Sequence, residues 1–288
     1  MINPVLKKEI KTRMRTWKTP AMISIYVLLL SVLVVFVFLE AYNLLSPYSM
    51  GIRPSDIKGL YYVLTVFQMI LIVFIVPATT SSSISGERER RTFDLLICSR
   101  LSSFSIVFGK LTASLAQILL LLIVSLPILS ILYLFGGVSP GNILILFSFY
   151  IINAFYFGSI GLFTSAYFRK TTTSTIVSYL ITLFLTAGTF VLFVFSMELL
   201  RNTGNNDITF FQRFLLYLNP LSGLSSILTE QVGEIFIPSQ WLKKDTWDTL
   251  VPLYINLGLD IVISSILLFL VSIKINPMGS FKRKSKAK

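Results

Sequence analysis

Residues 111–168, LTASLAQILLLLIVSLPILSILYLFGGVSPGNILILFSFYIINAFYFGSIGLFTSAYF, contain no charged side chain. The run is interrupted only by Gly136-Gly137-Val138-Ser139-Pro140-Gly141-Asn142, a cluster of turn-forming residues. It therefore predicts two antiparallel helices, at 111–135 and 143–168, joined by a tight turn. An α-helix needs ~20 apolar residues to cross a ~30 Å hydrocarbon core, and each half of the run is long enough.

Four further apolar stretches of similar length occur, at 20–39, 60–84, 174–197 and 250–273. Of the 288 residues, 54% are hydrophobic and only 13% are charged, and the mean hydropathy is +0.78. A soluble domain has about 25% charged residues. The runs do not alternate with period two, as the strands of a barrel would. We therefore predict an all-α polytopic membrane protein with six transmembrane helices, and not an aqueous enzyme or a disordered chain.

The basic residues are distributed unevenly between the connecting segments. Nineteen of the 25 Lys and Arg lie on one side of the membrane if the six helices alternate in direction. Because cytoplasmic segments carry the excess of Lys and Arg, we expect both termini in the cytoplasm and a multi-pass protein of the plasma membrane. The net charge of +12 then reflects topology and attraction to membrane lipids, and no nucleic-acid partner is expected. The predicted cytoplasmic segments are 1–19, 85–110, 169–173 and the basic tail 274–288, and the outer segments are 40–59, 136–142 and 198–249.

Residue types that carry catalysis are scarce. Histidine is absent and Cys98 is the only cysteine, which excludes zinc sites built from His and Cys, Ser-His-Asp triads and histidine proton relays. The phosphate-binding sequence Gly-x-x-x-x-Gly-Lys-Ser/Thr does not occur either. We therefore expect no catalytic residue, no metal site and no cofactor in this chain.

Two of the predicted cytoplasmic segments are amphipathic. In residues 3–18 apolar side chains recur at helical spacing with Lys and Arg between them, which is typical of a helix lying in the headgroup plane. In residues 85–110 a charged run, Ser85 to Arg91, leads directly into the apolar side chains of Phe93 and 95–97. These apolar side chains would be exposed to water unless a partner or the bilayer covers them. We interpret 85–110 as a docking element, with a solvated loop as the alternative; for 3–18 a plain interfacial anchor is the alternative to a contact role.

The outer segment 198–249 contains two apolar runs that are too short to span a bilayer. They extend from Ile208 to Leu218 and from Leu221 to Leu228, and Asn219-Pro220 separates them. This pattern predicts a re-entrant or interfacial helical hairpin.

Few polar groups lie inside the predicted spans. Asp260 is the only ionisable residue well within one. A carboxyl group there usually faces the bundle interior or a cavity, so Asp260 either lines a pathway or, when protonated, bonds a neighbouring helix. Small residues form a stripe on the fourth span, which predicts close helix packing. The stripe consists of Ala154, Gly158, Gly161 and Ser165.

Three features resemble the permeases of type-2 ATP-binding-cassette (ABC) transporters. The opening Asn3-Pro4-Val5-Leu6-Lys7-Lys8-Glu9-Ile10-Lys11 is similar to the sequence NPVLxKEL before the first span of these permeases. The stretch Ile84-Ser85-Gly86-Glu87-Arg88-Glu89-Arg90-Arg91-Thr92-Phe93-Asp94-Leu95-Leu96 resembles ISGERExGTLELLL, with Arg91 where glycine is usual. Gly109-Lys110 fits the GK that opens the third span in the family. The third feature is the six-span layout with a large outer segment before the sixth span.

The resemblance implies the membrane subunit of an ATP-driven exporter of lipids, glycans, peptides or drugs. It implies two facing permease subunits, identical or homologous, and two copies of a cytoplasmic ATPase that bind ATP and Mg. The implied ATPase-docking residues are Glu87, Arg88, Glu89, Arg90, Arg91, Thr92, Phe93, Asp94, Leu95 and Leu96 in the 85–110 coupling loop, and Lys7, Lys8, Glu9 and Lys11 in the N-terminal helix.

The main alternative is a secondary transporter or channel that works without an ATPase. Such proteins usually carry more intramembrane ionisable groups or an inverted repeat, whereas this sequence has Asp260 and no internal repeat. A membrane-embedded enzyme is a third interpretation, and it would need a catalytic cluster that the sequence lacks. Dependence of transport on a nucleotide separates these alternatives.

Overall fold

The computed structural model describes residues 15–41, 54–93, 102–134, 139–202, 210–233 and 251–275, together with Leu6, Glu9, Lys11 and Thr12. Every regular element in these ranges is helical. Within them, six helical units are long and apolar enough to cross a membrane, which confirms an all-α protein with six candidate spans.

The spans are formed by α2 (Lys18–Ala41), α3 (Pro54–Thr80), α6 (Ser103–Leu134), α7 (Pro140–Tyr167), the continuous unit of α8 (Thr171–Leu183), the π-helix η1 (Phe184–Gly188) and α9 (Thr189–Asn202), and α13 (Val251–Ile275). Three shorter helices complete the described elements. They are α4 (Ser85–Glu89), α10 (Phe210–Leu218) and α11 (Pro220–Val232).

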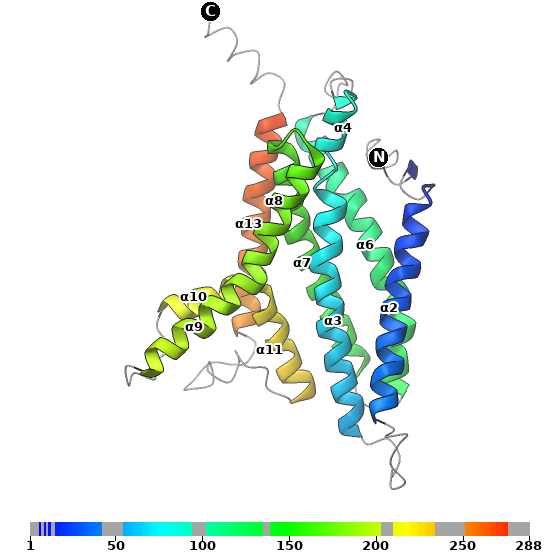
Figure 1. The fold of residues 1–288 in the computed structure, drawn as a ribbon, viewed down its shortest axis with the longest axis vertical. Helices are drawn as coiled ribbons and strands as arrows, with labels where there is room; N and C mark the ends of the chain where they lie inside the picture. Colours follow the sequence, from blue (N-terminus) through cyan, green and yellow to red (C-terminus); the bar gives the residue numbers. More distant parts are fainter. Residues whose placement is uncertain are drawn as a thin grey trace, which may run out of the picture.

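Helix α7 is the centre of the bundle and packs against α3, α6, α8 and α13. Helix α2 lies at one side against α3 and α6 (Figure 1). Large side chains such as Tyr61, Tyr150 and Phe157 are fully buried between the helices. Many apolar side chains on the outer faces remain exposed, as Phe36 and Phe269 do, which is expected where lipid takes the place of water.

The small-residue stripe on α7 allows its backbone to approach α3 and α6 closely. A Cβ atom added at Gly161 would lie 2.9 Å from Thr80 Cβ, and one at Gly158 would lie 3.0 Å from Leu111 Cδ1. Ser165, in the same stripe, bonds to residues beyond the end of α3. Close packing therefore explains the stripe, as predicted.

Helix α6 begins at Ser103, before the apolar run that starts at residue 111. The charge of Lys110 sets the start of the apolar run at residue 111. Because this charge is paired inside the protein, the helix can extend through Lys110 to Ser103. The start of α6 lies at the same end of the bundle as α4, the start of α2 and the end of α13 (Figure 1). We call this the α4 end.

The fifth span is interrupted by η1, and a helical hairpin packs beside it. Helices α10 and α11 meet at Asn219, which caps α11 by accepting a hydrogen bond from the Leu221 amide (2.8 Å). The Asn219 amide also donates to the Thr186 carbonyl of η1 (2.9 Å). A π-helix leaves carbonyl groups without their usual partners, and Asn219 satisfies one of them. The hairpin lies toward the bundle end opposite α4 (Figure 1).

Candidate functional site

Helix α4 is a short helix whose first turn is capped by another part of the chain. Its N-cap residue, Ile84, has no side chain that can cap. Ser165 near the end of α7 supplies the missing acceptor, because its Oγ accepts hydrogen bonds from the amides of Ile84 (2.8 Å) and Ser85 (2.9 Å). The start of α4 is therefore fixed to α7.

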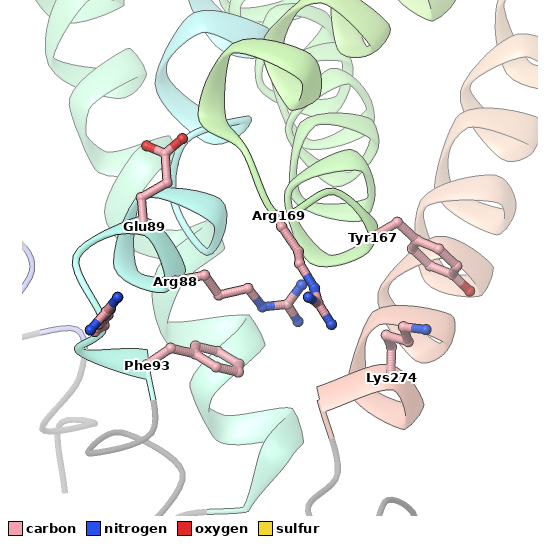
Figure 2. Close-up of a pocket in the computed structure, with 7 residues that line it drawn as sticks. Arg88, Glu89, Phe93, Tyr167, Arg169 and Lys274 are labelled. Carbon is pink, nitrogen blue, oxygen red and sulfur yellow. The ribbon is translucent and has the colours of Figure 1, made fainter.

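Arg88 ties the same helix to the end of α7. Its Nη1 donates to the Ala166 carbonyl (2.6 Å), one of the carbonyls left free where α7 ends. The guanidinium also lies over the Phe93 ring (Figure 2), 4.8 Å from its centre.

Glu89 connects α4 to α8. Its two carboxylate oxygens accept hydrogen bonds from the backbone amide and the hydroxyl of Thr171, both at 2.9 Å. Thr171 is the first residue of α8, and the N-cap of α8, Lys170, makes no side-chain cap of its own. The Glu89 side chain is exposed and lies beyond the end of α3. Glu89 thus caps α8 from outside.

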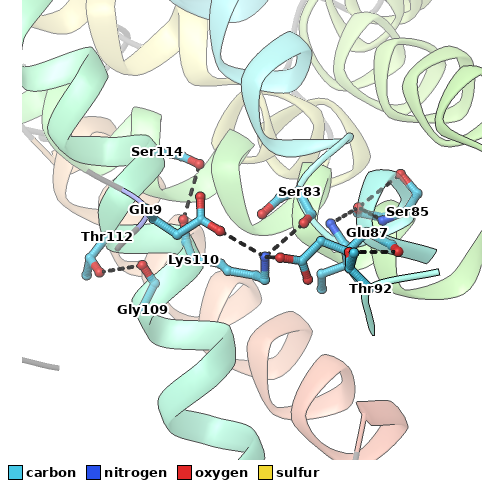
Figure 3. A network of polar contacts seen from close by, with 11 residues as sticks. Glu9, Ser83, Ser85, Glu87, Thr92, Gly109, Lys110, Thr112 and Ser114 are labelled. Carbon is cyan, nitrogen blue, oxygen red and sulfur yellow. Dashed lines mark hydrogen bonds and ion pairs between the residues drawn. The ribbon is translucent and has the colours of Figure 1, made fainter. Parts of the chain in front are cut away.

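Glu87 connects α4 to α6 through Lys110. The Lys110 ammonium lies 2.8 Å from Glu87 Oε1 and 3.2 Å from Glu9 Oε1, and it donates to the Ser83 carbonyl (3.0 Å). Figure 3 shows the ammonium group between the two carboxylates. Only 1% of the Lys110 side chain is exposed, so its charge depends on these partners. Glu9 brings the N-terminal segment into the same cluster.

Phe93 is buried by its own chain, and the expectation that it would be exposed without a partner is wrong. It packs in a cluster with Ile84, Val107, Leu162 and Leu268, drawn from four other parts of the chain. Arg88 covers one side of its ring. The sequence shows an apolar side chain after a charged run, but it does not show that α6, α7 and α13 meet there and cover it.

The outward side of this region is formed by Arg90, Arg91 and Thr92, all exposed. Arg91 has a φ of 57°, and among the described residues it is the non-glycine residue with positive φ. This left-handed conformation favours glycine, which is the residue that related sequences are expected to have at this position. Arg91 therefore keeps the turn at a cost in backbone strain.

The predicted docking residues fall into three groups. Glu9, Glu87, Arg88, Glu89 and Phe93 are used in contacts within the chain. Arg90, Arg91, Thr92 and Lys11 are exposed. The remaining ones, Lys7, Lys8, Asp94, Leu95 and Leu96, lie outside the described residues, as does most of the tail 274–288.

The sequence alone does not identify three residues of the site. Lys110 stands out there only as part of Gly109-Lys110, although a lysine at the start of an apolar run is a signal that its charge needs a partner. The small-residue stripe indicates only a packing role for Ser165. Thr171 has no local signal, because its role depends on where α8 begins relative to α4.

Asp260 lies in α13 with 2% of its surface exposed, so it faces the bundle interior. Its Oδ2 atom makes no hydrogen bond with the described residues. This position fits either of the two roles considered for it. Among the described residues, no group of three His, Cys, Asp or Glu side chains could hold a metal ion.

Comparison with known families identifies the class of this protein. A family described as ABC-2 family transporter protein matches residues 3–271, nearly the whole chain. The chain therefore belongs to the ABC-2 transporter family, as the resemblance indicated, and is a non-catalytic, multi-pass membrane subunit of an ABC transporter. Permeases of this family pair with ABC ATPases. No curated protein matches the sequence.

Proposed function

We propose that this permease exports an amphiphilic substrate and is driven by a separate cytoplasmic ATPase that docks at the α4 end. The α4 end, with the start of α2 and the end of α13, then faces the cytoplasm, in agreement with the excess of Lys and Arg in the predicted cytoplasmic segments. A second permease subunit, identical or homologous, completes the transport pathway, and two ATPase copies supply ATP and Mg. The substrate class, a lipid, glycan, peptide or drug, follows from the family resemblance.

The observation that carries this proposal is that the three charged side chains of α4 each bond to a different membrane helix. Glu87 is bonded to α6, Arg88 to α7 and Glu89 to α8. A helix held in this way cannot shift without pulling on three spans at once. We infer that α4 passes the movement of the ATPase to the membrane helices.

The contact with the ATPase is then made by side chains that do not bond to a membrane helix. Arg90, Arg91 and Thr92 follow α4 directly and are exposed. The positive charge of the two arginines fits an acidic surface on the ATPase, where partly desolvated charge pairs would fix the orientation of the two subunits. Lys11 of the N-terminal segment is exposed as well and extends the proposed contact.

The proposal separates docking from coupling, and an experiment on the assembled transporter can test both. In Arg90→Glu/Arg91→Glu the exposed charges are reversed, and we expect the ATPase to be lost on co-purification. In Glu89→Gln the ATPase should stay bound, because the exposed side is unchanged. The bonds to Thr171 are weakened in this variant, so less transport should result from each ATP hydrolysed.

Arg213→Glu is the control, since Arg213 is an exposed arginine on α10, far from α4. Co-purification and coupling in this variant should equal those of the wild type. Equal ATPase binding by Arg90→Glu/Arg91→Glu and Arg213→Glu would overturn the docking surface. Transport that persists without any ATPase would instead support a secondary transporter or channel.

A further inference from the structure

A pocket of about 740 Å³ lies beside α4, and its charge is strongly positive. Its cationic lining residues come from three separate elements: Arg88 and Arg91 from the α4 region, Arg169 from the turn between α7 and α8, and Lys274 from the last turn of α13. Glu89 also lines the pocket, but both of its oxygens are bonded to Thr171. The pocket therefore carries a large excess of positive charge.

The arrangement of the cations favours a negatively charged ligand. The guanidinium groups of Arg88 and Arg169 point toward one another, whereas the carboxylate of Glu89 points away (Figure 2). No described carboxylate forms an ion pair with Arg88, Arg169 or Lys274. Like charges brought together from different elements repel each other, and an anion between them would remove that repulsion.

The position of the pocket, at the ends of two candidate spans, indicates the kind of anion. The spans of α7 and α13 end at Tyr167 and Ile275, and Tyr167 and Lys274 line the pocket. The Lys274 ammonium lies 5.1 Å from the centre of the Tyr167 ring. Aromatic and lysine side chains at span ends mark the headgroup layer, where the phosphates of lipids lie.

We propose that this pocket binds the phosphate of an anionic phospholipid from the adjoining leaflet, with Arg88 and Arg169 on the phosphate oxygens and Lys274 at the rim. The aromatic ring of Tyr167 borders the headgroup, and the acyl chains lie along the apolar outer face of α13, where Phe269 and Ile273 are exposed. A lipid bound there would join α4, the α7–α8 turn and α13.

Native mass spectrometry of the purified full-length permease, without its ATPase, tests the site. Delipidated protein is mixed with phosphatidylglycerol or phosphatidylcholine, and the bound lipid is counted. We expect the wild type to retain phosphatidylglycerol in preference to phosphatidylcholine. Arg169→Gln and Lys274→Gln should each weaken phosphatidylglycerol binding about fivefold, the effect of one cation near a membrane surface.

Lys170→Gln is the matched control, because Lys170 is exposed next to Arg169 but does not line the pocket. It should bind phosphatidylglycerol like the wild type, and all three variants should unfold at the wild-type temperature in phosphatidylcholine. An equal loss in Lys170→Gln, or no loss in Arg169→Gln and Lys274→Gln, would overturn the site.

Inorganic phosphate serves as the competitor that separates the two sources of a phosphate group. It should displace the lipid poorly, since it has no acyl chains to hold it at the membrane surface. Displacement at equal concentration would assign the pocket to a soluble phosphate and overturn the lipid assignment. Because the ATPase is absent from these measurements, their outcome is independent of the docking proposal.

Discussion

The two ends of the helix bundle are held together by different kinds of polar contact. At the α4 end, charged groups join the helices: Lys110 with Glu9 and Glu87, and Glu89 with the start of α8. At the opposite end, neutral amides join them. Asn219 bonds to η1 in the fifth span, and Asn256 of α13 donates to the Tyr217 carbonyl (2.9 Å).

The difference follows from where the partners lie. Thr186 lies near the middle of its candidate span, where a charge would be costly and a neutral amide is not. The carboxylates of Glu9 and Glu87 lie at the edge of the bundle and are each about one-fifth exposed. Charged contacts near water can break and re-form at moderate cost, which suits a region proposed to move, whereas buried amide bonds suit a fixed support for the hairpin.

The largest effect is expected from removing both carboxylates around Lys110. In Glu9→Gln/Glu87→Gln the ammonium remains buried without a counter-charge, and breaking such a pair costs about 3 kcal/mol. We expect the free energy of unfolding in neutral detergent to fall by about this amount, measured by chemical denaturation.

Lys110→Met provides the comparison for this prediction. The two Glu side chains that remain are 19% and 20% exposed, so their carboxylates can turn toward water, and methionine fills the buried space. The loss should therefore be smaller, about 2 kcal/mol. An equal or larger loss in Lys110→Met would show that the cluster is not organised around the buried ammonium.

An intermediate effect is expected at the other end of the bundle, from Asn219→Ala. This change removes the cap of α11 and leaves the Thr186 carbonyl of η1 with only the long hydrogen bond from the Thr189 hydroxyl (3.5 Å), at a combined cost of about 2 kcal/mol. Ser139→Ala is a matched control, since Ser139 also precedes a proline and caps a helix, α7, but is exposed and bonds to the Asn142 amide alone. Its cost should be about 0.5 kcal/mol. Equal losses in denaturation would mean that Asn219 acts only as a cap.

The sequence predicted the membrane spans well and the polar contacts at the two ends poorly. Apolar runs of spanning length were sufficient to predict the six spans, because length and composition alone determine whether a helix can cross a membrane. The segment around Glu87 could be singled out because charged and apolar residues adjoin there. The partner of each charge could not be predicted, since Lys110, Ser165 and Thr171 reach α4 only through the packing of α6, α7 and α8. For the same reason the burial of Phe93 and the link from Asn219 to η1 had no local signal.

The smallest effect, and one of opposite sign, is expected at the exposed side of the α4 end. Arg91→Gly relieves the left-handed backbone at φ 57°. We expect the free energy of unfolding to rise by about 0.5 kcal/mol, because strain of about 1 kcal/mol is offset in part by the greater freedom of glycine in the unfolded chain. Arg90→Gly removes the same charge one residue earlier, where φ is −77°, and should lower stability by about 0.5 kcal/mol.

The opposite signs of these two variants, measured by denaturation in neutral detergent, decide what keeps Arg91 in place. Stabilisation by Arg91→Gly together with weaker binding of the ATPase would mean that the arginine is retained for its charge at the expense of stability. That result would sharpen the contrast between the two ends, since the Asn219 end contains no described non-glycine residue with positive φ. Destabilisation by both variants would instead mean that the Arg91 side chain stabilises α4, so that the exposed side also helps to hold α4 against the bundle.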